Sequence, residues 1–158
     1  MPHPPSNTNL RGEIETELVS SGVLVTSMRG YMTGQHLSDR LEQFRALVEQ
    51  THCGTWIIDS LDLTGFEPAS VARAALWFDL FKQRQGVHIL FVSNLPPARM
   101  AAATLAFAVH VKITCCRELS RAYEEAGVGT RSVRPSQFTL SPPKSSAEGL
   151  GSSTGRRN

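Results

Sequence analysis

The 158-residue sequence predicts an α/β fold in which a mixed, mostly parallel β-sheet is flanked by helices. Two runs, residues 55–59 and 87–92, are almost free of polar side chains, which is typical of strands buried on both faces of a parallel sheet. A segment with helical character follows each run, as in a β-α-β unit. Near the start, two short runs rich in β-branched residues predict a hairpin, which adds one antiparallel pair to the sheet.

The first elements are this hairpin and an amphipathic helix. Residues 14–19 and 23–28 are the expected strands, and Ser20-Ser21-Gly22 between them predicts the turn. From Gln35 onward, apolar residues recur at three- and four-residue intervals with charged residues between them, which indicates a helix with one apolar face. Gly54 is the expected stop signal of that helix.

After the strand at residues 55–59, we expect a loop over residues 60–67 and then a second helix. Pro68 suits the first turn of that helix, because the N–H group that proline lacks would be unpaired there in any residue. The helix is expected to continue to about Gln85 and to end at Gly86. Its periodicity directs one broad apolar arc toward the sheet, formed by Val71, Ala74, Trp77, Phe78 and Phe81.

The remaining segments continue the alternation of strands and helices. Pro96-Pro97 begins an alanine-rich helix that reaches about His110. Deep burial and an oligomer contact would each explain its alanines. Residues 111–114 are expected to form a short edge strand, and residues 117–126 a last helix. The expected order is β-β-α-β-α-β-α-β-α, with helices covering the faces of the sheet.

Charge is unevenly distributed along the chain, although the net charge is only +2. Residues 130–158 contain five basic residues and one acidic residue, whereas residues 1–129 contain 11 basic and 13 acidic residues. The tail is rich in Ser, Pro and Gly and has too few large apolar groups to offset its ordering entropy, so we expect disorder. Residues 1–12 are interpreted as a flexible arm and residues 13–129 as the folded domain. Because this part is mildly acidic, the folded domain is not expected to bind nucleic acid.

Composition argues against several other classes of protein. No apolar run approaches the roughly 18 residues that span a bilayer, and the longest, residues 101–111, contains Thr104 and His110. The opening residues lack the basic start and apolar stretch of a secretory signal. Three cysteines, two of them adjacent, do not form a disulfide framework. We therefore expect a cytoplasmic protein without a membrane span.

The residues also form no pattern that indicates catalysis or a cofactor. None of the five histidines is spaced from another ligand type as in a metal site, and Cys115-Cys116 is not a Cys-x-x-Cys pair. Asp59 ends a buried strand, as the phosphorylated aspartate of a response-regulator receiver does, but the acidic pair and the lysine of such a site are missing. We expect no enzymatic activity, no metal and no cofactor.

The order of elements, together with residues 56–70, resembles the STAS family, named for sulfate transporters and anti-sigma-factor antagonists. The resemblance covers roughly residues 13–127. Ile57-Ile58-Asp59 is similar to the strand end of the family, and Asp62-Leu63-Thr64-Gly65-Phe66 to the loop that follows it. The resemblance implies a STAS-like fold and a bacterial signalling module that binds a protein partner.

The family typically has Asp-Ser-Ser-Gly at the start of the next helix, and a partner kinase phosphorylates one of the serines. Counted on from Asp59, Glu67 falls at the acidic position, Pro68 and Ala69 at the serines, and Ser70 at the glycine. The usual phosphoacceptor position thus lacks a hydroxyl group, and a shift by one residue would make Ser70 the acceptor. Glu67 supplies a permanent negative charge where unpaired helical N–H groups favour an anion, although it and Pro68 also simply begin a helix well.

The second helix contains the expected partner-binding surface. Leu76 and Leu80 lie one turn apart on the side opposite the apolar arc, beside Arg73, and an apolar pair flanked by polar groups is typical of a docking surface. Alternatively, another helix or the tail covers both leucines. The expected partner-binding residues are Asp62, Thr64, Glu67, Ser70, Arg73, Leu76 and Leu80.

These observations predict a non-enzymatic regulatory module without the usual phosphoserine. Its partner would be a kinase-like anti-sigma factor, a switch protein or a scaffold, bound through the helix that starts near Pro68. The alternative is a small structural or lipid-binding domain of the same fold, or a non-catalytic subunit of a larger complex. A homo-oligomer is compatible with both interpretations.

Overall fold

One mixed sheet forms the centre of the computed structural model, which describes residues 12–129. Its strands are β1 (Glu13–Ser20), β2 (Val23–Met32), β3 (Thr55–Phe66), β4 (His88–Val92) and β5 (Lys112–Cys116). They lie side by side in chain order. β1 and β2 form an antiparallel hairpin, and every pair from β2 to β5 is parallel. The expected arm and the expected disordered tail lie outside the described residues, except for Gly12.

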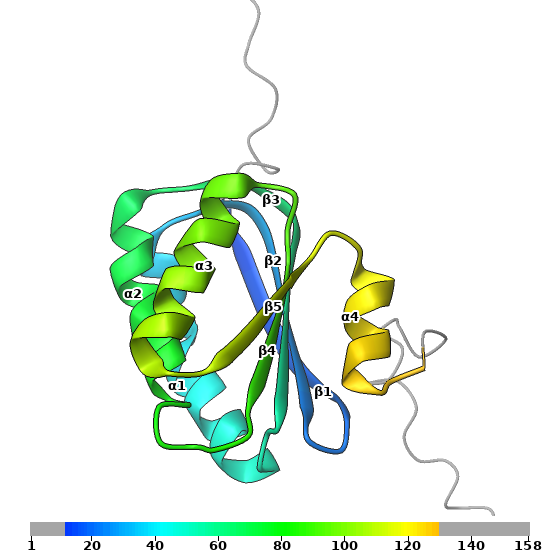
Figure 1. The fold of residues 1–158 in the computed structure, drawn as a ribbon. Coiled ribbons are helices and arrows are strands. Elements are labelled where there is room, and N and C mark those ends of the chain that lie inside the picture. Colours follow the sequence, from blue (N-terminus) through cyan, green and yellow to red (C-terminus); the bar gives the residue numbers. More distant parts are fainter. Residues whose placement is uncertain (1–11, 130–158) are drawn as a thin grey trace, which may run out of the picture.

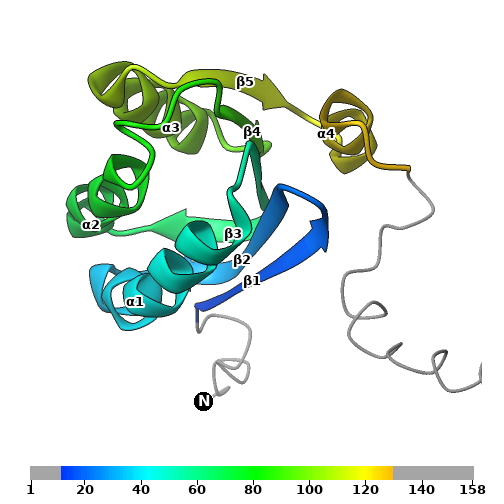
Figure 2. The ribbon, with the colours of Figure 1, turned by 90° about the horizontal axis from the view of Figure 1, so that it is seen from below.

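Four helices accompany the strands: α1 (Gly34–Thr51), α2 (Pro68–Asp79), α3 (Pro96–Val109) and α4 (Leu119–Ala126). The first three connect neighbouring parallel strands and lie together on one face of the sheet, which we call the three-helix face (Figure 1). Right-handed crossovers between strands that follow in order place their helices on the same side. α4 alone lies on the opposite face, the α4 face (Figure 2). The predicted fold class, a mixed and mostly parallel sheet with flanking helices, is confirmed.

An aromatic cluster fills the core of the three-helix face. The rings of Phe44 and Trp77 stack with centroids 4.4 Å apart, and Trp56 lies 4.7 Å from Phe44. Both indole N–H groups have partners: Trp77 donates to the carbonyl of Leu37 at 3.1 Å, and Trp56 donates to the hydroxyl of Thr26 at 2.9 Å. Aromatic pairs of this kind add to the stabilisation from their buried area, so the cluster fixes α1 and α2 on the sheet.

The core of the α4 face is smaller and mostly aliphatic. Ala122 and Tyr123 of α4, together with Val128 beyond the helix, pack against aliphatic side chains of four strands. These side chains are Val19, Val23, Val25, Ile57, Leu90 and Val92. α4 has one apolar side and ends at Gly127, whose φ of 79° is a conformation that glycine adopts without strain.

Two expectations about β3 and α2 were wrong. The segment 60–67, expected as a loop, continues β3 to Phe66, because β2 also continues to Met32 and the two strands remain paired in parallel. α2 ends at Asp79, six residues before the expected end, and the chain then turns over residues 80–83. The turn places Phe81 in the core, where the expected helix had also directed it.

The other boundaries agree with expectation to within a few residues. α1 begins after Thr33, whose side chain accepts a hydrogen bond from the N–H group of His36. It ends at Thr51, before the expected stop at Gly54, since His52 takes the left-handed conformation with φ of 50°. α3, β5 and α4 lie where the residue pattern placed them.

Candidate functional site

The N-terminal ends of α1 and α2 meet where β2 and β3 end. The N–H group of Glu67 donates to the carbonyl of Met32 at 3.0 Å, so the chain passes from the β2–β3 ladder directly into α2. Pro68 is the first residue of that helix, as predicted. The carboxyl ends of parallel strands and the following helix starts form the edge at which α/β proteins commonly place their binding sites.

The carboxylate of Glu67 binds the start of α1 rather than that of α2. Its Oε2 accepts a hydrogen bond from the N–H group of Gly34 at 2.7 Å, and it makes no side-chain bond to the N–H groups of α2. A β-carbon on Gly34 would lie 3.1 Å from Cγ of Arg73, so the two helix starts are in close contact. A negative charge here stabilises the positive end of the α1 dipole and joins α1 to α2.

Ser70 lies inside the fold. Its side chain is 3% exposed, and its hydroxyl donates to the carbonyl of Glu67 at 2.6 Å. The neighbouring Ala69 is exposed in the first turn of α2. The accessible position therefore has no hydroxyl, and the residue that has one is enclosed.

The outward side of α2 contains one of the two leucines singled out in the sequence. Leu76 is 42% exposed, and Arg73 is exposed one turn before it. Leu80 instead packs against the core of the three-helix face, because the helix has already ended and the chain is turning inward. The expected leucine pair is thus not a single exposed surface. Trp77 and Phe78 face the sheet as predicted.

Two further expected residues lie on the extension of β3. Asp62 and Thr64 are exposed, while Leu63 between them is buried, as in any strand with one covered face. Tyr31 was missed by the sequence reasoning, which ended β2 at Met28. A β-carbon on Gly65 would lie 3.3 Å from the Tyr31 ring, so this exposed tyrosine borders the end of β3. The buried Met32 follows the exposed Tyr31, and this alternation of side chains, typical of a strand, could have predicted that β2 continues to both residues.

Two exposed apolar residues on α3 were not predicted from the sequence. Met100 is 70% exposed and Phe107 is 81% exposed, and both lie on the outward side of the helix. The inward side is made of small residues that pack against the sheet and α2: Ala98, Ala102, Ala106 and Val109. Met100 and Phe107 are seven residues apart and so lie on the same side of the helix, two turns from each other. This spacing could have predicted that they share one side of α3.

A small cavity of about 90 Å³ lies between α2, α3 and the sheet. Its lining is apolar apart from Thr26 and Ser70, and both hydroxyls already have hydrogen-bond partners. Such a cavity offers no polar atom to a ligand, and it can hold only a small apolar group.

The titratable groups of the described residues do not converge on a reactive centre. No cluster of three or more His, Cys, Asp or Glu side chains within residues 12–129 could hold a metal ion. Burial raises the pKa of the thiols of Cys53, Cys115 and Cys116, which disfavours the nucleophilic thiolate. Burial, followed by the charge of Lys112, lowers the pKa of His88, whose Nε2 lies 2.8 Å from the Thr114 hydroxyl. No helix in the same range is long and apolar enough to cross a membrane.

Comparison with known proteins supports the fold. No family model and no curated protein matches the sequence. Among solved structures, the unphosphorylated form of the anti-sigma factor antagonist SpoIIAA matches with a TM-score of 0.55 and 12% identity, over 73% of this chain and 100% of that chain. The phosphorylated form of SpoIIAA, a Bacillus cell fate determinant, matches with a TM-score of 0.57 and 11% identity, over 72% and 99%.

A third structure, an anti-sigma factor antagonist from Mycobacterium paratuberculosis, matches with a TM-score of 0.51 and 15% identity. The match covers 73% of this chain and 93% of that chain. All three neighbours are anti-sigma factor antagonists, and the shared order of strands and helices agrees with the STAS resemblance of the sequence. The described residues of this chain therefore have the mixed α/β fold of SpoIIAA.

Proposed function

We propose that this protein is a cytoplasmic, non-enzymatic regulatory module that binds a protein partner through the outward side of α2. The partner class is that of the anti-sigma factor antagonists: a kinase-like anti-sigma factor, a switch protein or a scaffold. The observation that carries the proposal is the exposed Leu76 beside Arg73 on α2, in a fold shared with such antagonists. We call the proposed contact the α2 surface; it consists of Glu67, Arg73 and Leu76. The expected residues Asp62 and Thr64 are left out, because they alternate with Leu63 of the three-helix core and therefore face the other side of the sheet.

The α2 surface has the composition that a modest protein contact needs. Leu76 offers an apolar group that is only partly buried, and covering a leucine completely contributes about 1.5–3 kcal/mol relative to full exposure. Arg73 and Glu67, which meet at Gly34, supply charges of both signs next to it, and such charges favour the correct partner more than they add affinity. Ser70 and Leu80 support this surface from inside the fold.

The same region supports binding that does not depend on a phosphoserine. Ala69 occupies the exposed first-turn position without a hydroxyl, and the Ser70 hydroxyl is enclosed and already donates a hydrogen bond. A phosphate added there would bring roughly −1.5 to −2 charges into a contact surface. We therefore propose that the module stays in its binding-competent state, with Glu67 as the fixed charge of the site.

The test compares two leucines with similar exposure on different elements. The full chain, its Leu76→Asp variant and its Leu18→Asp variant are used to capture partners from the native cell, and any partner found is then purified and titrated. Leu18 is 45% exposed on β1, so it controls for the loss of an exposed leucine. We expect Leu76→Asp alone to weaken binding at least tenfold, with both variants melting close to the wild type. Equal binding of the purified partner to all three chains would refute the proposal.

The cavity favours a second candidate, a domain that binds small apolar molecules. At about 90 Å³ it is smaller than an engineered cavity of about 150 Å³ that holds one benzene, so a lipid chain does not fit without rearrangement. Lipid binding is for this reason the weaker candidate. Saturable binding of a fatty acid that Ala102→Leu abolishes would favour it over the protein-binding proposal.

A further inference from the structure

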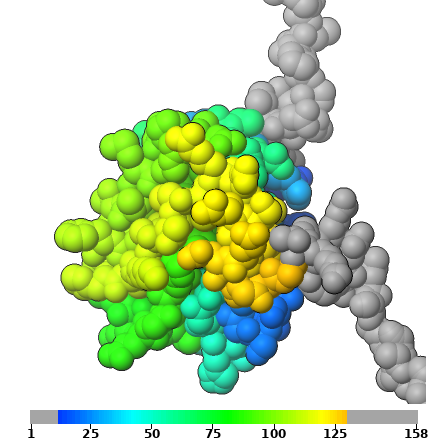
Figure 3. Space-filling view, turned by 45° about the vertical axis from the view of Figure 1, so that its right-hand side comes forward, coloured from blue at the N-terminus to red at the C-terminus, as the bar shows by residue number. Residues whose placement is uncertain are grey.

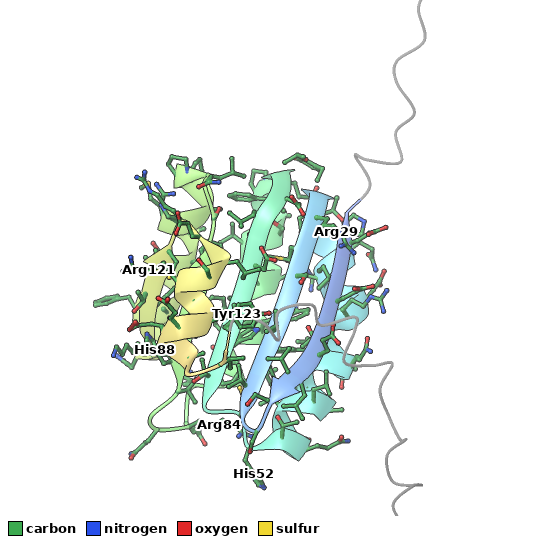
Figure 4. All side chains as sticks on the ribbon, turned by 90° about the vertical axis from the view of Figure 1, so that its right-hand side faces the viewer. Arg29, His52, Arg84, His88, Arg121 and Tyr123 are labelled. Atoms are coloured by element: carbon green, nitrogen blue, oxygen red, sulfur yellow. The ribbon has the colours of Figure 1, made fainter. Side chains whose placement is uncertain are left out.

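Part of the α4 face is open. α4 packs against β3, β4 and β5, and within residues 12–129 the outer part of β1 and β2 lies beside this helix rather than under it. In Figure 4, Arg29 is on the part of the sheet that α4 leaves uncovered, and Tyr123 is at the border between α4 and that part. In the space-filling view, α4 (yellow to orange) stands beside the blue surface of the β1–β2 hairpin (Figure 3).

The open part of the sheet is acidic. Ile14 faces the three-helix core, so the glutamates that alternate with it along β1 face the opposite side of the sheet. Ile57 of β3 faces the α4 side, and Asp59, two residues later, faces the same side. We call Glu13, Glu15, Glu17 and Asp59 the acidic face.

One base of the described sheet partly neutralises these carboxylates. Arg29 lies opposite Glu13 in the ladder and makes exposed ion pairs with Glu13 at 3.2 Å and with Glu15 at 3.8 Å. No ion pair within 4 Å joins Glu17 or Asp59 to a base among residues 12–129. The acidic face therefore retains excess negative charge.

A buried polar group beside the acidic face also lacks a partner. Tyr123 is 1% exposed, and its hydroxyl has no hydrogen-bond partner among the described residues. Burial first, and then the charges of Asp59 and Glu17, raise the pKa of Tyr123 to about 12. Buried hydroxyls are nearly always paired, so this edge of the α4 face is less completely satisfied than the three-helix core.

The described chain ends on the same side of the sheet. The N–H group of Val128 donates to the carbonyl of Tyr123 at 2.9 Å, and Val128 belongs to the core of the α4 face. Gly129 follows as the last described residue. At about 3.4 Å per extended residue, Arg131 can reach about 7 Å from Gly129 and Arg134 about 17 Å. Strands rise about 3.3 Å per residue, so the segment up to Arg134 can extend alongside about five residues of β1.

We propose that the first basic residues beyond Gly129, Arg131 and Arg134, bind the acidic face of the same chain. Guanidinium groups can donate several N–H bonds at once to carboxylates. The segment containing them has five basic residues and one acidic residue, so its charge complements the acidic face. The attachment at Gly129 makes the contact intramolecular, with an effective concentration of about millimolar order.

This contact is distinct from the proposed partner surface. The acidic face lies on the α4 side of the sheet, whereas α2 lies on the three-helix side. Binding of the tail and binding of a partner can therefore be measured separately. Failure of the tail proposal would leave the proposed function untouched, and the reverse also holds.

The test uses amide chemical shifts of the full chain. Wild-type protein is compared with Arg131→Glu/Arg134→Glu and with the matched control Arg156→Glu/Arg157→Glu, which changes the same charge far from Gly129. Each is recorded at about 50 mM and about 500 mM NaCl, because exposed ion pairs are screened at high salt. We expect salt-dependent shifts of the β1 amides and Tyr123 in the wild type and in the control, and their loss in the first variant.

A charge exchange completes the test. Glu15→Arg/Glu17→Arg should abolish the salt-dependent shifts, and combining it with Arg131→Glu/Arg134→Glu should restore them. Identical shifts in the wild type and the Arg131→Glu/Arg134→Glu chain at low salt would overturn the proposal. An equal loss in the Arg156→Glu/Arg157→Glu chain would overturn the assignment to these two arginines, since the contact would then depend on tail charge alone.

Discussion

The two faces of the sheet differ in how they are covered and in what they contain. On the three-helix face, stacked aromatic rings fill the space and both tryptophan N–H groups are paired. On the α4 face, one short helix covers an aliphatic core, and the tyrosine hydroxyl beside it has no partner among the described residues. The larger core therefore lies under the three crossover helices, whereas the second face combines a smaller core with exposed charged side chains.

The largest expected effect is on the three-helix face. Trp77→Ala removes the ring that stacks on Phe44 and leaves a cavity, so we expect a loss of about 3–5 kcal/mol in the free energy of unfolding. Phe107→Ala, on the exposed side of α3, should change it by less than about 0.5 kcal/mol. Urea denaturation measures both. A similar loss from both substitutions would contradict the contrast between buried and exposed aromatic residues.

Tyr123→Phe tests the α4 face at alkaline pH. The fold raises the pKa of Tyr123 from 10.0 to about 12, so the unfolded chain ionises first and stability falls as the pH rises between these values. We expect the wild type to lose on the order of 2 kcal/mol more than Tyr123→Phe between pH 10 and pH 12. Parallel curves of unfolding free energy against pH for the two proteins would show that the phenol is not held neutral by the fold.

A smaller effect is expected at Asp59, also on the α4 face. Burial raises its pKa, partly opposed by the N–H group of Leu61, so the folded state prefers the protonated carboxyl. The corresponding stability is fully present below the ordinary carboxyl pKa and is lost as the pH rises through the raised value. Asp59→Asn should remove this loss and be more stable than the wild type at pH 7. Thermal melts from pH 3 to pH 7 measure it, and a less stable variant at pH 7 would contradict the prediction.

Segments with a clear period could be predicted from the residues, and segments without one could not. The apolar face of α1 and the apolar runs at residues 56–58 of β3 and 89–92 of β4 identified those elements directly. The ends of β2 and β3 were missed because Gly30 and Gly65 interrupt the pattern, and pairing with the neighbouring strand maintains the extended backbone there. The end of α2 was missed because residues 80–85 contain no glycine or proline to stop a helix.

The candidate site was predicted in part, for the same reason. Glu67, Arg73 and Leu76 were identified from their places on an expected helix, and the structure leaves Arg73 and Leu76 exposed. Tyr31 was missed because its position depends on how far β2 runs. Leu80 packs against the core because the chain turns directly after α2, and no residue in this segment indicates such a turn.

Residue type and spacing were enough to establish the order of strands and helices, the missing hydroxyl at Ala69 and the separation of charge between residues 1–129 and residues 130–158. These are local properties, set by residue type and spacing. Only the tertiary structure decided that Glu67 binds Gly34, that Ser70 is enclosed and that the Tyr123 hydroxyl is left without a described partner. The physical reason is that burial and hydrogen bonding join residues far apart in the chain, and their partners are known only once the helices are packed on the sheet.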